Sequence, residues 1–357
     1  MDFRGEIALK FAVQSAGQYT VPELVRLAKL AHTEGFKQVW VNDNLGQRNI
    51  FVVLTAIAAQ VPIKLGTSII VPYFRNPADI AGSLAALSEL TPGREVSVGI
   101  ARGDLAHAGQ HIDMQKPIAM VRETTLALKA LLAGETIRFR DYPAPAAYHH
   151  IHPEQEFRLA FSPAAPLRFY CGGNGPKILK IAGEIMDGTL IGNHYIPLVR
   201  SRRLDSLMAI ARASAQAKQP VKTLFDICEL DISISRDRQR ALQFAKPYVA
   251  GIILNLERLG FSDDDFQSLG IARRLVQSLK EACASGTTIR AVSTLIPDTT
   301  VTTCFVAGGP EECCDQVAAL IDYAGRHQFG QITFAKLGPD YDEAIELLRH
   351  QVLPHYV

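Results

Sequence analysis

The segment best suited to chemistry is a glycine-rich turn, Cys171-Gly172-Gly173-Asn174-Gly175-Pro176-Lys177. A run of β-forming residues precedes this turn, and a helical pattern with proline at its first position follows it. Free backbone N–H groups, the positive end of the helix dipole and Lys177 would meet there, which is the arrangement that binds a phosphate group. The alternative is a tight strand-to-helix turn without a ligand, and the pattern favours the phosphate site.

Polar residues also follow two earlier predicted strands. After the second strand, the Asp43 carboxylate and the Asn44 amide could form hydrogen bonds to a ring-shaped cofactor, although either residue could instead cap the next helix. After the fourth strand, Gly103 permits close approach of the backbone to a ligand. Asp104 lies beside it and could act on a substrate or simply pair with Arg102 at the surface.

Histidine and cysteine residues give a weaker signal. His194 is a minor candidate for the site, whereas His107 and His111 have no carboxylate or thiol at the spacing of a metal site or a catalytic triad. The six cysteines form no CxxC pair, so we expect reduced thiols and no metal.

Short β-rich runs alternate with longer helical runs along the chain, a rhythm typical of parallel strands joined by crossover helices. Eight such units predict a (β/α)8 TIM barrel, an α/β fold whose active face is built by the loops that follow the strands. Residues 136–168 and 236–300 interrupt the rhythm and are interpreted as insertions in a single domain spanning 1–357. An open doubly wound sheet would need a GxGxxG motif after its first strand, and Gln14 to Gly17 provide none.

Composition restricts the classes of partner. With 37 basic and 36 acidic residues the net charge is +1, so neither nucleic acid nor an anionic membrane surface is an expected partner. No apolar run reaches the roughly 18 residues of a membrane span, and the N-terminal residues do not form a signal peptide. We therefore expect a cytoplasmic protein that acts on a small molecule.

These motifs together resemble the bacterial-luciferase-like superfamily. The run from Gly175 to Gly188, GPKILKIAGEIMDG, is similar to the GPxxLxxAGExxDG pattern of the coenzyme F420-dependent branch, which includes methylene-tetrahydromethanopterin reductase. Three further segments support the likeness, namely Ser88–Arg94, Leu131–Glu135 and Gly308–Glu312. The resemblance implies a barrel with an insertion, a homodimer, and a flavin or deazaflavin ring at the mouth of the barrel.

The resemblance also assigns roles to residues. Asp43 and Asn44 would lie beside the ring, although the family often has histidine where this chain has Asn44. Ser68 and Ile69 match the place where the family has a cis peptide bond behind the ring. Gly103, Asp104 and the turn from Gly172 to Lys177 would receive the polar tail of the cofactor.

Three functions remain open at this stage. The first is hydride transfer between the deazaflavin F420 and an unidentified small substrate, the second is an FMN-dependent monooxygenase that uses O2, and the third is a non-catalytic flavin-binding protein. The pterin reductases carry acidic residues where this chain has Lys10 and Val52, so it lacks two carboxyl groups that could protonate a pterin. We therefore expect little or no reduction of methylene-tetrahydromethanopterin.

Overall fold

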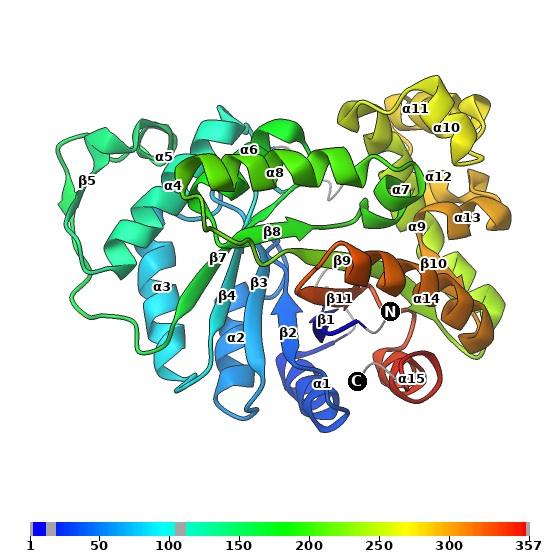
Figure 1. The fold of residues 1–357 in the computed structure, drawn as a ribbon, viewed down its shortest axis with the longest axis horizontal. Coiled ribbons are helices and arrows are strands. Elements are labelled where there is room, and N and C mark those ends of the chain that lie inside the picture. The colour runs from blue at the N-terminus through cyan, green and yellow to red at the C-terminus, as the bar shows by residue number, and fades with distance from the viewer. Residues whose placement is uncertain (1–2, 12–18, 104–111, 355–357) are drawn as a thin grey trace.

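The computed structural model describes residues 3–11, 19–103 and 112–354. Within these ranges, eight parallel strands form one sheet in the order β9, β11, β1, β2, β3, β4, β7, β8. The sheet closes into a barrel because the last strand, β8, pairs with the first, β9. The predicted (β/α)8 TIM barrel is therefore confirmed (Figure 1). Its strands are β1 (Glu6–Phe11), β2 (Gln38–Val41), β3 (Lys64–Ile70), β4 (Val96–Ile100), β7 (Leu167–Gly172), β8 (Gly188–Ile191), β9 (Ile227–Ile234) and β11 (Gln331–Ala335).

Amphipathic helices follow the strands and cover the outside of the barrel. Several begin with a side-chain cap; at the first of them the Thr20 hydroxyl and the Glu23 carboxylate form a reciprocal capping box. The helices that surround the barrel are α1 (Val21–Thr33), α2 (Ile50–Ala58), α3 (Pro77–Glu89), α4 (Pro117–Leu132), α6 (Pro176–Ile185), α7 (Tyr195–Arg200), α8 (Leu204–Lys218), α14 (Pro310–Arg326) and α15 (Tyr341–Leu347).

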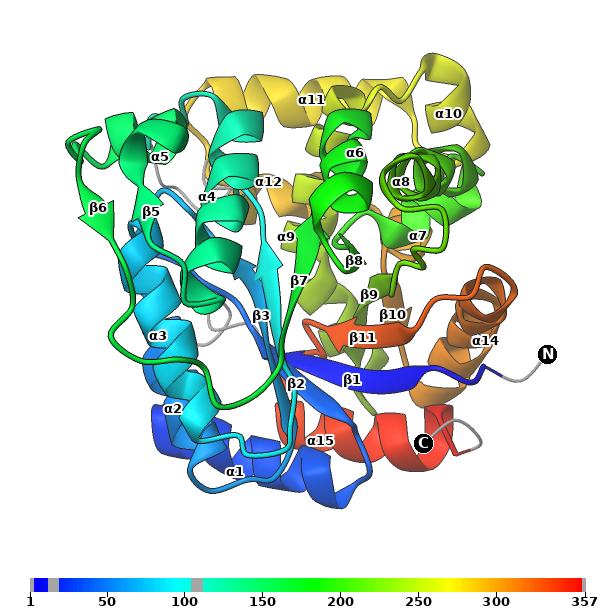
Figure 2. The same cartoon turned by 60° about the vertical axis from the view of Figure 1, so that its left-hand side comes forward.

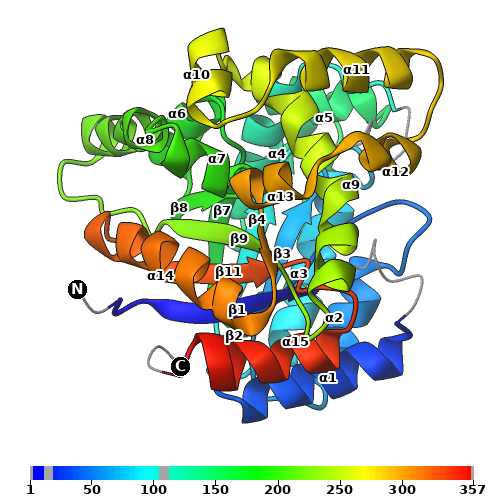
Figure 3. The ribbon, with the colours of Figure 1, turned by 90° about the vertical axis from the view of Figure 1, so that its right-hand side faces the viewer.

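The two predicted insertions have different structures. The first contains the antiparallel pair β5 (Ile137–Arg138) and β6 (Glu156–Phe157) with helix α5 (Pro143–Tyr148), all beside α4 (Figure 2). The second is largely helical and includes α9 (Arg238–Leu256), the 3-10 turn η2 (Glu257–Leu259), α10 (Asp263–Ser268), α11 (Arg273–Ala284), α12 (Ile289–Val292) and α13 (Asp298–Cys304). Helices α10 and α11 lie at the same end of the molecule as α6 and α8 (Figure 3). A short strand, β10 (Val306–Gly308), then pairs with β9 outside the barrel closure.

Side chains fill the lower part of the barrel. Trp40 and Tyr170 pack edge to face, with ring centroids 6.1 Å apart, in one cluster with Ala8, Leu190 and Ile227. A side chain at Gly66 would place its Cβ 2.3 Å from the Trp40 ring, so glycine is needed at that position. The indole N–H of Trp40 donates to Gln331 Oε1 at 2.8 Å, which satisfies a buried donor. The barrel is thus closed to ligands below and can accept one only at the carboxyl ends of its strands.

None of the helices in the described ranges is long and apolar enough to cross a membrane.

Candidate active site

A cavity of about 560 Å³ opens at the carboxyl ends of the barrel strands. All nine residues that the sequence predicted to bind the cofactor line it, and they come from the ends of β3, β4 and β7 and the start of α6. They are Ser68, Ile69, Gly103, Gly172, Gly173, Asn174, Gly175, Pro176 and Lys177. Residues predicted from three separate segments therefore meet in one place.

The glycine-rich turn has the geometry expected of a strand-to-helix anion site. Gly173 has φ +144°, and a Cβ at Gly172 would lie 2.8 Å from Ile69 Cγ2, so the backbone there needs glycine. Gly175 is the N-cap of α6 and supplies no side-chain hydrogen bond to the first turn of the helix. A Cβ at Gly175 would meet nothing within 4 Å, so the turn is open at the N-cap of α6.

Asn174 and His194 link this turn to the loop after β8. The Asn174 amide Nδ2 lies 3.0 Å from His194 Nδ1, and both residues line the cavity. The Asn174 Oδ1 atom is buried and has no hydrogen-bond partner among the described residues. A buried acceptor of this kind is unusual in a protein interior, and it belongs to a residue that lines the cavity.

The peptide bond between Ser68 and Ile69 is cis, as the resemblance implied. The Ile69 side chain lies close to both Gly99 and Gly172, since a Cβ on either glycine would approach Ile69 Cγ2 within 3.3 and 2.8 Å respectively. Neighbouring strands therefore hold Ile69 at the wall of the cavity.

The three predicted catalytic residues are placed differently. Asp43 and Asn44 are not among the described residues that line the cavity. Asp43 is 4% exposed and accepts a 2.6 Å hydrogen bond from Arg75 Nη1. Burial raises the pKa of the Asp43 carboxyl group, and the ion pair with Arg75 opposes this shift. The third residue, Asp104, lies outside the described residues, and the roles of all three stay predictions.

The alternative role considered for Asp43 and Asn44, capping the next helix, is wrong. Helix α2 begins at Ile50, and its N-cap is Asn49. The Asn49 side-chain oxygen accepts hydrogen bonds from Phe51 N at 2.9 Å and Val52 N at 3.3 Å. Because Asn49 already satisfies these N–H groups, Asp43 and Asn44 have no capping role.

The sequence did not predict that two charged residues in the cavity wall form an ion pair. Lys10 on β1 donates from Nζ to both carboxylate oxygens of Glu229 on β9, at 2.7 and 2.9 Å. The Ser68 hydroxyl donates to Glu229 as well. Burial lowers the pKa of Lys10, and the attraction of Glu229 acts in the opposite direction. Two acidic residues two positions apart in a largely apolar strand, Glu229 and Asp231, are the signal that could have revealed this cluster.

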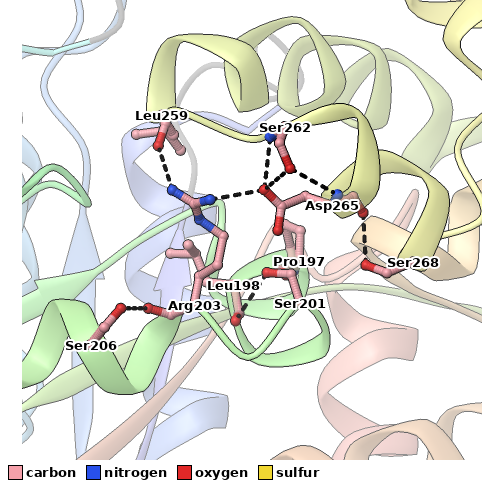
Figure 4. A network of polar contacts seen from close by, with 9 residues as sticks. All are labelled: Pro197, Leu198, Ser201, Arg203, Ser206, Leu259, Ser262, Asp265 and Ser268. Atoms are coloured by element: carbon pink, nitrogen blue, oxygen red, sulfur yellow. Dashed lines mark hydrogen bonds and ion pairs between the residues drawn. The ribbon is translucent and has the colours of Figure 1, made fainter.

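The second insertion forms another wall of the cavity through Asn255, Arg258 and Leu259. Figure 4 shows how Arg203, which precedes α8, holds this segment. Its guanidinium donates to Asp265 Oδ2 at 2.8 Å and to the Leu259 carbonyl at 3.4 Å. It also lies 4.8 Å from the centre of the Phe261 ring. The insertion is therefore tied to the barrel beside the cavity.

Fold and site together define a class, namely (β/α)8-barrel proteins with a cavity at the carboxyl ends of the strands and a glycine-rich turn after one of them. Within that class, the chain belongs to the luciferase-like monooxygenase family, whose model matches residues 6–328. The resemblance inferred from the sequence is thereby confirmed.

Individual relatives are similar over nearly the whole chain. A 5,10-methylenetetrahydromethanopterin reductase of Methanolobus tindarius is 27% identical over 97% of this chain and 100% of its own length. An F420-dependent glucose-6-phosphate dehydrogenase of Nakamurella multipartita is 25% identical over 95% of this chain and 94% of its own. The solved structure of the coenzyme F420-dependent tetrahydromethanopterin reductase of Methanopyrus kandleri shares the fold, with a TM-score of 0.74 at 23% identity and 99% of each chain covered. These relatives are oxidoreductases, in agreement with the predicted class of enzyme.

Proposed function

We propose that this protein binds coenzyme F420 and catalyses hydride transfer between it and a small organic substrate. The observation that carries the proposal is the glycine-rich turn at the open N-terminus of α6, with Lys177 beside it on the cavity. The names of relatives such as the F420-dependent glucose-6-phosphate dehydrogenase add support. A cytoplasmic location, expected from the sequence, and a homodimer, implied by the family resemblance, are part of the same proposal.

The residues of the cavity fit a cofactor that has a flat ring and a phosphate-bearing tail. The N–H groups at the start of α6 and the Lys177 ammonium would hold the phosphate, since the space in front of Gly175 is open. Asn174, which lines the cavity, would lie beside the polar tail. Ser68 and Ile69 would contact the ring from one side. When bound, a deazaflavin supplies a carbon centre that accepts or donates hydride.

The apolar side chains of the cavity serve this chemistry by excluding water. Val121, Ile178 and Leu190 line it together with Ile69 and Leu259. In a site of low polarity, the charges of Lys10 and Glu229 interact more strongly with a substrate than they would in water.

An FMN-dependent monooxygenase is the second candidate, and the name of the matching family favours it. The two functions differ in their need for oxygen. A non-catalytic flavin-binding protein is the third candidate and would turn over neither cofactor.

The test is an assay with reduced F420 under anaerobic and aerobic conditions, in which the return of oxidised F420 absorbance is followed. We expect oxidation with small carbonyl compounds at equal rates in both atmospheres. We expect no oxidation with methylene-tetrahydromethanopterin, because Lys10 carries no carboxyl group and Val52 lies on the exposed face of α2 with 58% exposure. Product formation only with reduced FMN and O2 would favour the monooxygenase. Rapid oxidation of reduced F420 by the pterin would show that a different acid serves as proton donor.

A further inference from the structure

The Lys10–Glu229 ion pair occupies a distinct place in the cavity. Lys10 and Glu229 are only 8% and 2% exposed, and both line the cavity wall. Their strands, β1 and β9, are separated by β11, where Ala335 lies level with both Lys10 and Asp231. Lys10 therefore reaches past one intervening strand to Glu229, and the β11 residue level with it, Ala335, has a small side chain.

This pair is costly if its only role is structural. Desolvating two charges consumes most of the energy that their attraction returns, and apolar residues of similar volume often stabilise a barrel interior as well or better. Buried charges on a cavity wall are concentrated at functional sites for this reason. The position of the pair therefore calls for a ligand-directed role.

The phosphate of the cofactor does not account for Lys10. In the closed order β1, β2, β3, β4, β7, β8, β9, β11, the strand of Lys10 stands four places from β7, which carries the glycine-rich turn. Lys10 and the turn are therefore on opposite sides of the barrel. An anion held at Lys177 leaves the Lys10 ammonium facing a different part of the cavity.

The hydrogen-bonding capacity of Lys10 supports a ligand contact. An ammonium group carries three N–H donors, and Glu229 is its one hydrogen-bond partner among the described residues, through two contacts. The Glu229 carboxylate, which also accepts a hydrogen bond from the Ser68 hydroxyl, fixes the ammonium in place, so little side-chain entropy is lost when a ligand accepts the remaining hydrogen bond.

We infer that Lys10 is a substrate-binding residue, fixed by Glu229, which recognises a carboxylate or carbonyl oxygen of a small substrate. This inference rests on the proposed function in that it names the class of substrate for the same cavity. A cation that donates a hydrogen bond favours an oxygen bearing negative charge and disfavours a neutral or basic group at the same position.

Oxalate is a suitable probe, because it is small and presents only carboxylate oxygens. Its dissociation constant is measured by isothermal titration with the native protein that has first been saturated with F420, so that Lys177 is occupied. We expect Lys10→Gln, which keeps an N–H donor for Glu229 and removes the charge, to bind oxalate at least tenfold more weakly. Lys10→Arg should retain binding within a few fold.

The matched control is Lys64→Gln. Lys64 also pairs with a glutamate, Glu6, but it lies at the start of β3 at the opposite end of the barrel. This variant should bind oxalate like the native protein. Equal oxalate affinity in native protein and Lys10→Gln, or no binding by the native protein, would overturn the inference.

The inference and the proposed function can fail separately. F420 binding by Lys10→Gln, followed by fluorescence quenching, should match that of the native protein and also reports that the barrel is folded. If F420 does not bind the native protein but oxalate binds in a Lys10-dependent manner, the proposed function falls and the substrate contact stands. If F420 binds but oxalate binding does not depend on Lys10, the proposed function stands and the substrate contact falls.

Discussion

Asp231 is a carboxyl group buried in the barrel, and neither of its oxygens has a hydrogen-bond partner among the described residues. Burial raises its pKa to about 6, which the nearby Lys336 partly opposes. Because this pKa lies above that of the unfolded chain, ionisation costs more in the folded state. Asp231 therefore contributes least to stability above about pH 6 and progressively more as the pH falls through that value.

Replacement of Asp231 by Asn removes this cost. We expect the free energy of unfolding of Asp231→Asn to exceed that of the native protein, with a gain that grows by about 1 kcal/mol from pH 5 to pH 8. Urea denaturation at the two pH values measures it. A gain that is the same at the two pH values would contradict this prediction, because Asp231 would then have the same protonation state at pH 5 and pH 8.

Lys177 is the residue whose charge bears most directly on the phosphate site. Lys177→Glu places a negative charge at the N-terminus of α6, where it would repel a phosphate, so we expect F420 to bind several-fold more weakly. Lys180→Glu is the matched control, since Lys180 lies on the same helix, its side chain is 66% exposed and it is not among the residues that line the cavity. Equal loss in both variants would indicate a general effect of charge.

Single residues differed in how well the sequence predicted their position. The turn from Gly172 to Lys177 could be predicted because glycine and proline report backbone geometry that is local in the chain. The ion pair of Lys10 with Glu229 could not, since 219 residues separate the two partners. The ion pair of Asp43 with Arg75, 32 residues away, was not predicted either.

At the scale of elements, the position of the phosphate turn depends on how α6 packs against α8. Gly183 on α6 allows close contact, because a Cβ there would lie 2.1 Å from Ala211 O and 2.8 Å from Ala215 N. We expect Gly183→Ala to lower the free energy of unfolding by about 1–3 kcal/mol through overpacking.

Gly82 on α3 provides the matched control for this prediction. A Cβ at Gly82 would meet nothing within 4 Å, so Gly82→Ala should raise stability by about 0.5–1 kcal/mol through helix propensity. Thermal or urea denaturation of both variants compares them. Equal effects in the two helices would show that helix propensity, and not the α6–α8 contact, sets the response at Gly183.

Element types followed from sequence periodicity, whereas the shape of the second insertion did not. The sequence predicted an interruption at 236–300 and did not predict where that segment packs. In the structure, its residues Asn255, Arg258 and Leu259 form part of the cavity wall. That placement depends on Arg203 and Asp265, whose contact joins segments 62 residues apart and has no local sequence signal.

At the scale of the whole molecule, the barrel was predictable because eight strand-helix units and the right-handed crossover rule leave few alternatives. The active face was predictable for the same reason, since every loop after a strand lies at one end. Substrate identity is set by side chains that contact one another inside the barrel. Such contacts join residues far apart in the chain, so no local sequence pattern predicts them. We further propose that residues 1–357 fold as one domain, with both insertions packed on the barrel.

The measurement that tests the central claim most directly is a competitive titration of the purified protein with F420 and with FMN, followed by quenching of cofactor fluorescence. The account predicts that F420 binds more tightly than FMN and displaces it, because the turn at Lys177 and the cavity beside it suit the deazaflavin tail. Tighter binding of FMN, or FMN that remains bound through purification, would contradict the account and assign the protein to the oxygen-using branch of its family.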